Sequence, residues 1–332
     1  MAIIEAKNLT REFKVFKKNS SSFYLLKKMF SRKAETKKVV DNLNLTIEEG
    51  DFVGYLGPNG AGKSTTIKML SGVLTPTDGE ITVLGMSPTK QRKAYAQKIG
   101  VLYGQRSQLW WDLPLIESFE LLKAIYKVPE DEYKKRLDRF VELLDMQEFL
   151  YRPVRVLSLG QRMKGEIVAT LLHSPPILFL DEPTIGLDVL AKDRIQEFLR
   201  IINKEEKVTI ILTSHNMDDI EKLCNRIILI DQGKVMFDGS TEKLKTLTGK
   251  KKILILDIPP NQIDIAAPIV PLKVEGNRLF FEVSDDSEIS KLITKLSNFY
   301  EVLKVEIDEP EVEEVLKDLY ISKQYQLEEV SS

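Results

Sequence analysis

The stretch Gly57-Pro58-Asn59-Gly60-Ala61-Gly62-Lys63-Ser64-Thr65 decides the fold, because it satisfies the pattern G-x-x-x-x-G-K-[ST] of a phosphate-binding loop. Glycines without a Cβ atom let the backbone wrap around an anion and turn its N–H groups inward. Lys63 adds a compact positive charge, and Ser64 places a hydroxyl where a magnesium ion would bridge the phosphates. A plain glycine turn is the alternative reading. The flanks favour the phosphate loop, because a buried strand is predicted over 51–56 and a helix begins near 65.

The composition narrows the class of protein. A chain of 332 residues exceeds one typical core and suggests a large and a small domain. The net charge of −2 gives no sign of a nucleic-acid partner, and we expect none. The single cysteine, Cys224, excludes an internal disulfide and fits a reducing cytosol. No signal peptide is recognised, and no apolar run approaches the ~20 residues that span a bilayer, so a membrane role would require a partner.

Strands and helices alternate through the first two thirds of the chain, which predicts a mainly parallel α/β sheet. Strands are predicted over 51–56, 99–103, 177–180, 208–213, 226–230 and 235–237, and helices over 65–70, 91–98, 189–203 and 216–224. From about 106 to 165 the apolar spacing is helical, with clear helices over 116–126 and 133–144. Near the N-terminus, residues 2–16 are predicted as two strands separated by a turn at 8–10. Residues 39–47 alternate as in an antiparallel strand.

A second small α+β domain is predicted after residue 248, so the proposed domains are 1–248 and 249–332. Strands are expected over 253–258, 268–274, 278–283 and 301–307, and helices over 286–298 and 310–320. Residues 17–38 are a separate basic segment with interleaved aromatic residues. This segment is either an amphipathic helix near anionic lipid or an exposed hairpin insertion, and we favour the hairpin.

Two further motifs carry chemistry. Asp181 and Glu182 follow the apolar run 177–180, and doubly wound sheets bind their ligands at this end of a strand. Asp181 can hold magnesium through water, and Glu182 can orient and polarise an attacking water. About twenty residues earlier, Ser158 is a predicted helix N-cap, and Gly160 lets backbone N–H groups face an anion.

In this order, the motifs resemble those of ATP-binding cassette (ABC) ATPases, the motor subunits of membrane transporters, over about residues 2–240. The matching segments are the phosphate loop at 57–65, Gln105 in 102–106, the signature at 157–161, the acidic motif at 177–182, the loop at 185–188, and His215 in 213–216. The resemblance implies an α/β fold: a P-loop ATPase core with an antiparallel β subdomain and a helical subdomain at about 106–165.

The resemblance also implies ATP and Mg²⁺ as cofactors. The catalytic residues that it implies are Glu182 as base, together with His215 and Lys63. Magnesium would be held by Ser64, Gln105 and Asp181. Nucleotide contacts are implied for Phe13, which matches the family's adenine-stacking aromatic, and for Gly57, Pro58, Asn59, Gly60, Ala61, Gly62, Lys63, Ser64, Thr65, Gln105, Ser158, Gly160, Gln161 and Asp188.

Family members work as pairs, in which Ser158 and Gly160 would complete the site of the opposite ATPase subunit, identical or not. Nucleotide-driven closing and opening of the pair would then power transport. One departure from the family is visible, because Leu159 stands where the family has a first glycine. Gln108 is an alternative to Gln105 as the family glutamine, and we prefer Gln105 because it follows the predicted strand directly.

Two segments outside the shared motifs bear on which membrane partner the chain would bind. The segment 105–114 holds Trp110 and Trp111, which would either dock a permease or pack the helical subdomain itself. The segment 307–316 is similar to the C-terminal part of ABC-2 type drug and small-molecule exporters, whose permeases are separate chains. The second domain, 249–332, would either regulate the ATPase or only stabilise it. The resemblance therefore implies a peripheral subunit at the cytoplasmic face of the plasma membrane.

Other functions fit the sequence less well. A non-transport ABC ATPase that acts as a switch on another macromolecule is the main alternative. Ribosome-acting members usually carry two cassettes, and chromosome-structure members carry long coiled coils, whereas this sequence has one phosphate loop and no heptads over 106–156. A P-loop kinase would not need the segment 157–161.

Overall fold

A computed structural model describes residues 1–15, 35–104, 106–214, 216–246, 251–263, 269–284, 286–309 and 312–319. The chain divides into two compact units, Met1–Gly239 and Ser240–Ser332, which are described separately below. Gln105, His215 and most of the basic segment 17–38 lie outside the described residues.

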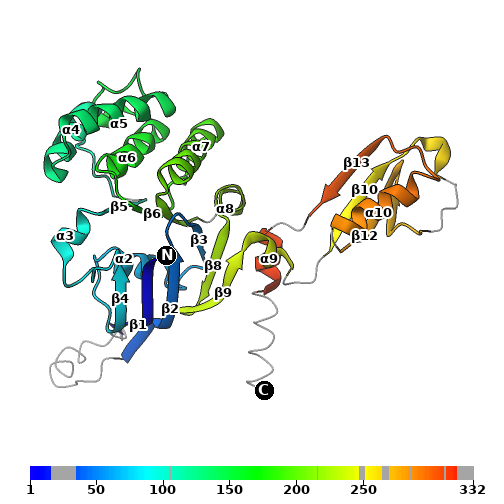
Figure 1. Ribbon diagram of the computed structural model, residues 1–332, viewed down its shortest axis with the longest axis horizontal. Helices are drawn as coiled ribbons and strands as arrows, with labels where there is room; N and C mark the ends of the chain where they lie inside the picture. The colour runs from blue at the N-terminus through cyan, green and yellow to red at the C-terminus, as the bar shows by residue number, and fades with distance from the viewer. Residues whose placement is uncertain are drawn as a thin grey trace, which may run out of the picture. The chain divides into compact units, whose positions relative to one another are not determined.

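The first unit is built on a six-stranded sheet in the order β5-β6-β7-β3-β8-β9 (Figure 1). Its strands are β3 (Phe52–Leu56), β5 (Ile99–Tyr103), β6 (Ile177–Asp181), β7 (Thr209–Thr213), β8 (Arg226–Asp231) and β9 (Lys234–Ser240). All pairings from β5 through β8 are parallel. Every residue of β3 and β7 is buried, as expected for strands covered on both faces. The predicted parallel α/β sheet is confirmed.

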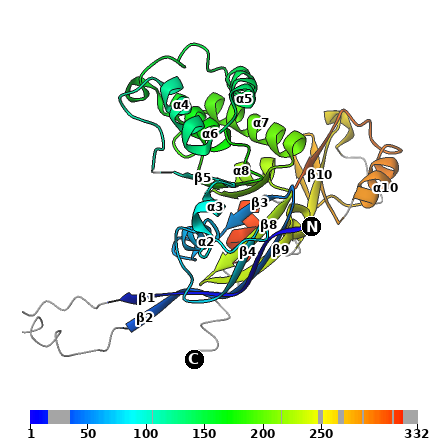
Figure 2. The same ribbon diagram turned by 60° about the vertical axis from the view of Figure 1, so that its left-hand side comes forward.

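A three-stranded antiparallel sheet in the order β2-β1-β4 forms the second layer of this unit. Figure 2 shows β1 (Ala2–Val15) and β2 (Glu35–Glu48) side by side as one long ribbon, and β4 (Asp78–Val83) pairs with β1. The predicted turn at 8–10 is wrong, because β1 is a single strand with shifts of register there. Asn8 takes a left-handed conformation, with φ 50°, and its N–H donates to Asn44 Oδ1 at 3.0 Å. Asparagine tolerates this conformation, so the chain forms a bulge instead of a turn.

Seven α-helices are described in the first unit. They are α2 (Lys63–Leu70), α3 (Arg92–Ala96), α4 (Leu115–Tyr126), α5 (Glu130–Leu143), α6 (Leu159–Leu171), α7 (Val189–Glu206) and α8 (Met217–Leu223), with a 3-10 turn at Val154–Val156. Helix α6 packs against α4, α7 and β5, so it joins the predicted helical subdomain to the sheet. Phe140 of α5 meets Phe198 of α7 edge to face, with ring centroids 5.2 Å apart.

The second unit contains a four-stranded antiparallel sheet in the order β11-β12-β10-β13. Its elements are α9 (Thr241–Thr246), β10 (Lys252–Asp257), a 3-10 turn at Pro260–Gln262, β11 (Lys273–Glu275), β12 (Arg278–Val283), α10 (Asp286–Leu296) and β13 (Lys304–Asp308), and residues 312–319 are helical. Leu254, Leu256 and Phe281 of the sheet share a core with Ile289 and Leu296 of α10. Strand β11 is shorter than the predicted 268–274 and starts later, after Pro271, which has no N–H to donate to a neighbouring strand.

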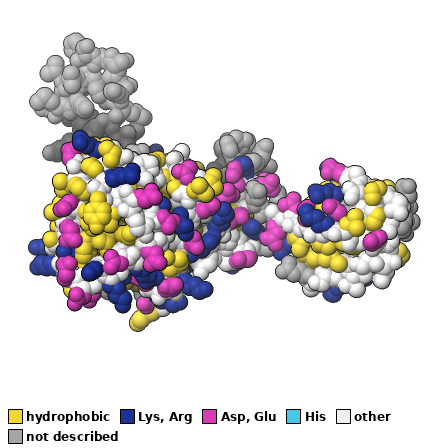
Figure 3. Space-filling model, turned by 90° about the horizontal axis from the view of Figure 1, so that it is seen from above, with side chains coloured by type: hydrophobic (Ala, Val, Ile, Leu, Met, Phe, Trp, Pro, Cys, Tyr) yellow, Lys and Arg dark blue, Asp and Glu magenta, His cyan; other side chains and the backbone are white. Residues whose placement is uncertain are grey.

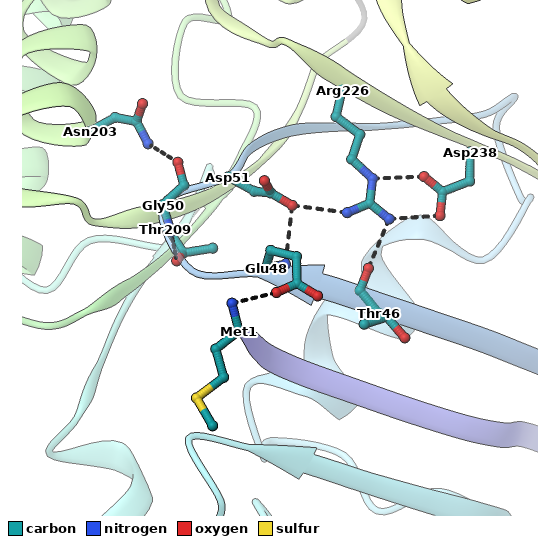
Figure 4. Close-up of polar contacts among 9 residues, drawn as sticks. All are labelled: Met1, Thr46, Glu48, Gly50, Asp51, Asn203, Thr209, Arg226 and Asp238. Carbon is teal, nitrogen blue, oxygen red and sulfur yellow. Dashed lines mark hydrogen bonds and ion pairs between the residues drawn. The ribbon is translucent and has the colours of Figure 1, made fainter.

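Arg226 on β8 fastens the two sheets of the first unit together (Figure 4). Its guanidinium contacts Asp51, just before β3, at 2.9 Å and Asp238 of β9 at 2.7 Å. It also donates to the carbonyl oxygen of Thr46, on β2, at 2.8 Å. The planar fork of arginine suits this paired recognition of carboxylates. One side chain therefore links β2, β3, β8 and β9.

We expect Arg226→Met to lower the free energy of unfolding by about 2 kcal/mol, because two partly buried carboxylates lose their counter-charge. Arg194→Met is the matched control, since Arg194 pairs with Asp145 and Glu197 at a more exposed position. Urea unfolding of both variants measures the difference. Equal losses in the two variants would contradict the role assigned to Arg226.

Candidate active site

The predicted phosphate loop connects β3 to α2, and its conformation requires glycine at two positions. A Cβ added at Gly57 would lie 2.3 Å from the carbonyl oxygen of Ile230. Gly62 caps α2 with φ 107°, and a Cβ added there would lie 2.6 Å from the carbonyl oxygen of Val39 on β2. Two backbone bonds shape the loop: Ala61 N–H donates to Pro58 O at 3.1 Å, and Thr66 N–H to Gly62 O at 2.9 Å. The start of α2 therefore faces the loop with its free N–H groups, which suits an anion.

Lys63 folds back over this loop. Its ammonium donates to the carbonyl oxygens of Gly57, at 2.6 Å, and Pro58, at 3.2 Å. Burial lowers the pKa of Lys63, and the carboxylates of Glu182 and Asp181 act in the opposite direction. The positive charge of Lys63 thus lies close to the acidic pair, as a site for a phosphate and its metal ion requires.

The acidic pair lies at the carboxyl end of β6. Asp181 Oδ1 accepts a hydrogen bond from Thr213 Oγ1 at 2.6 Å, and Glu182 N–H donates to Thr213 O at 3.0 Å. Glu182 has φ 56°, a left-handed conformation that costs a non-glycine residue free energy and often marks functional sites. Ser64, Asp181 and Glu182 line one cavity of about 410 Å³. A neighbouring cavity of about 190 Å³ is lined by Glu182 and the phosphate loop.

The donor set at this edge fits magnesium. Ser64 and Asp181 offer hard oxygen ligands in the same cavity, and Mg²⁺ commonly binds one or two protein oxygens together with substrate phosphates. Within the described residues, no cluster of three or more His, Cys, Asp or Glu could hold a metal ion on its own.

A second cluster gathers around the start of α6. The predicted N-cap is confirmed: Ser158 Oγ accepts from Gln161 N–H at 3.2 Å, and Gln161 Oε1 accepts from Ser158 N–H at 3.1 Å. The helix begins at Leu159, earlier than the predicted start near 162. Ser158, Gly160, Gln161 and Asp188 line a cavity of about 630 Å³ that shares no residue with the two cavities beside the phosphate loop.

Phe13, the expected adenine contact, lies on β1 with a partly exposed ring, and the guanidinium of Arg11 is 4.7 Å from the ring centroid. It pairs with Lys37 of β2, two residues before Val39, which lines the cavity at the phosphate loop. Gln108, the alternative to Gln105, donates its side-chain amide to Val101 O at 3.4 Å.

Sequence reasoning missed two buried carboxylates near these loops. Glu166 of α6 accepts hydrogen bonds from Ser107 Oγ and from Gln108 N–H, which hold the segment after residue 105 to α6. Burial raises the pKa of Glu166. Asp219 of α8 accepts from Thr184, two residues after Glu182. Glu166 could have been found from the sequence, because it is an acidic residue at a position of the predicted helix where an apolar residue is expected. No comparable signal marked Asp219, which stands among other acids.

Comparison with known proteins agrees with this geometry. The ABC transporter family profile matches residues 40–185. The ABC transporter ATP-binding protein NatA of Bacillus subtilis is 36% identical over 215 residues, or 65% of this chain and 87% of NatA. The linearmycin resistance ATP-binding protein LnrL of Bacillus subtilis is 31% identical over 304 residues, or 89% of this chain and 96% of LnrL.

Solved structures agree as well. A dimeric post-hydrolysis structure of the ATP-binding cassette MJ0796, bound to ADP and Pi, has a TM-score of 0.60 and 26% identity. The match covers 71% of this chain and 98% of that one. The chain belongs to the ABC transporter ATP-binding family, and it is an ATPase of that fold. The resemblance drawn from the sequence motifs is confirmed. Among the described residues, no helix is both long enough and apolar enough to cross a membrane.

We expect Gly62→Ala to weaken ATP binding much more than Gly60→Ala. Both positions have positive φ, 107° and 83°, so the backbone strain is similar. Only the Cβ at Gly62 would collide with Val39 O, whereas the one at Gly60 meets nothing within 4 Å. Calorimetric titration with a non-hydrolysable ATP analogue measures the two affinities. Equal losses would show that the close approach to β2 does not shape the loop.

Proposed function

We propose that this chain is the ATP-hydrolysing subunit of an ABC-2 type membrane exporter and works with separate permease subunits at the cytoplasmic face of the membrane. The main support is its similarity to LnrL, a protein named for linearmycin resistance, over 96% of the length of that protein. The daunorubicin resistance ATP-binding protein DrrA3 of Streptomyces coeruleorubidus is 32% identical over 236 residues. Both relatives carry names of drug resistance, which favours export over import.

The residues around the phosphate loop divide the work of hydrolysis. Lys63 and the N–H groups at the start of α2 hold the β- and γ-phosphates, and Phe13 stacks on the adenine. Ser64, Asp181 and Gln105 would hold Mg²⁺, which would supply positive charge to offset the charge that develops on the phosphates. Glu182 orients the attacking water and accepts its proton, and His215 contacts the γ-phosphate. The shared cavity of Ser64, Asp181 and Glu182 supports this division.

Ser158, Gly160, Gln161 and Asp188 serve the nucleotide of a second ATPase subunit. Their cavity is separate from the cavities at the phosphate loop of the same chain, so each copy offers two different half-sites. The dimeric MJ0796 structure supports a pair of cassettes as the working assembly. Nucleotide binding and hydrolysis belong to residues 1–248, and 249–332 form an accessory domain.

We expect Glu182→Gln to lower ATP turnover by about a hundredfold or more, since the amide cannot accept the proton of the water. Nucleotide binding persists, so a nucleotide-bound dimer accumulates. Phosphate release measures turnover, and light scattering with Mg²⁺ and ATP measures the mass of the particle. Glu142→Gln, a substitution at an exposed position of α5, is the control and keeps normal turnover. Unchanged turnover in Glu182→Gln would refute the assignment of the base.

We assign permease docking to the surface that carries Trp110 and Trp111. The two side chains are 38% and 51% exposed, which disfavours their packing into the core of the helical subdomain. Arg162 of α6 lies over the Trp111 ring, 5.5 Å from its centroid, and keeps this ring in place. Figure 3, seen from above, shows hydrophobic side chains gathered over the helical part of the first unit. Exposed aromatic anchors of this kind are typical of interface hot spots.

We expect the double variant Trp110→Ala/Trp111→Ala to lose copurification with its permease while the isolated subunit keeps its ATP turnover. The reason is that both rings lie on the surface and outside the residues that line the two phosphate-loop cavities. Ile125→Ala on α4, also exposed, is the control and retains the permease. Copurification that persists in the double variant would rule out this docking surface.

A further inference from the structure

The carboxylate of Asp219 is buried, and both of its oxygens have hydrogen-bond or ion-pair partners. Its side chain is 1% exposed, close to the start of α8. Oδ2 accepts from Thr184 Oγ1 at 2.5 Å and from Ser214 Oγ at 3.4 Å. Oδ1 accepts from Gln196 Nε2 at 2.7 Å and pairs with Lys192 Nζ at 2.6 Å. A charge buried this deeply is tolerated because it has a counter-charge and several donors.

The partners of Asp219 come from three segments that carry residues of the hydrolytic site. Thr184 follows Glu182 by two residues, and Ser214 immediately precedes His215. Lys192 and Gln196 lie on α7, four and eight residues after its N-cap Asp188. The acidic loop, the segment around His215 and the start of α7 therefore meet at one carboxylate.

The segment around His215 is bound to Asp219 on both sides. Ser214 Oγ contacts the carboxylate and also accepts from Asn216 N–H at 3.0 Å. Asn216 Oδ1 in turn accepts from the N–H of Asp219 at 3.2 Å. Ser214 and Asn216, which precede and follow His215 in the sequence, are therefore both bonded to Asp219.

We propose that Asp219 is a positioning residue for ATP hydrolysis, which keeps the loop after Glu182 and the segment around His215 at a fixed separation. This inference rests on the proposed roles of Glu182 and His215. At the ends of the two strands, Glu182 N–H donates to Thr213 O at 3.0 Å and Thr213 Oγ1 donates to Asp181 Oδ1 at 2.6 Å. Beyond these bonds, Asp219 links Thr184 to Ser214 through its carboxylate. Small displacements of catalytic groups lower the rate steeply, so this contact acts on turnover.

A purely structural role for Asp219 predicts a different result. If the carboxylate only fastened α8 to α7, its loss would lower stability without singling out the chemical step. A positioning role predicts a lower kcat at nearly unchanged affinity for ATP. The ratio of kcat to nucleotide affinity therefore distinguishes the two roles.

The decisive variant is Thr184→Val, which removes one donor and leaves Asp219 with Lys192, Gln196 and Ser214. We expect kcat to fall by about tenfold or more. The affinity for a non-hydrolysable ATP analogue with Mg²⁺ should stay within about twofold, because that substitution changes no residue lining either phosphate-loop cavity. Thr184→Ser returns the hydroxyl and should recover most of the lost turnover.

A second test compares Asp219→Asn with the matched control Glu206→Gln. Glu206 is a partly buried carboxylate at the other end of α7, paired with Arg136 and Arg139 at 2.9 Å. We expect both variants to lose stability, as thermal unfolding of the full chain would show. Only Asp219→Asn should lose kcat.

Two results would overturn the inference. One is wild-type kcat in Thr184→Val. The other is a loss of kcat in Glu206→Gln as large as in Asp219→Asn, which would attribute the effect to stability. Glu182→Gln separates this inference from the function on which it rests. If that variant loses turnover and Thr184→Val does not, only the positioning role of Asp219 fails; if Glu182→Gln keeps turnover, the proposed base fails.

Discussion

The nucleotide-binding site depends on the close packing of the phosphate-loop backbone against strand β2. The backbone at Gly62 lies so near Val39 O that no side chain fits between them. Two further bonds tie the loop to the same strand: Gly233 N–H donates to Ala61 O at 2.9 Å, and Asp41 N–H, on β2, donates to Gly233 O at 3.0 Å. The loop is therefore shaped by the antiparallel sheet and by the turn between β8 and β9, as well as by its own glycines.

This arrangement explains why two sheets are needed. The parallel strands β3, β6 and β7 deliver the loop, the acidic pair and Thr213 to the same edge, as their register requires. The antiparallel strand β2 then presses on the loop at that edge, and Arg226 holds β2 to β3 and β8 near the opposite ends of the parallel strands. The rigid scaffold is thus fixed at both ends of the sheet, and the catalytic loops lie on a preorganised frame.

Much of the fold and part of the site could be read from the sequence, for physical reasons that particular residues illustrate. The run 177–180 is apolar throughout because β6 is covered on both faces, and the phosphate loop needs its glycines and lysine together. Asp219 could not be found in this way, because Asp218, Asp219 and Glu221 together look like a solvated helix face, and only the fold shows which one is buried. Nor could the bulge at Asn8, since asparagine serves turns and bulges equally well. Both the burial of Asp219 and the bulge at Asn8 depend on contacts with residues distant in the sequence.

The proposed separation of two half-sites within one chain also has a consequence for mixed assemblies. Two identical copies related by a twofold axis bury the same patches on each other, and therefore form two equivalent composite sites. In a pair where one copy is damaged at the phosphate loop and the other at the start of α6, both lesions fall in the same composite site. The remaining site keeps a full set of residues. Intragenic complementation between two inactive alleles would then arise from the geometry of the pair alone.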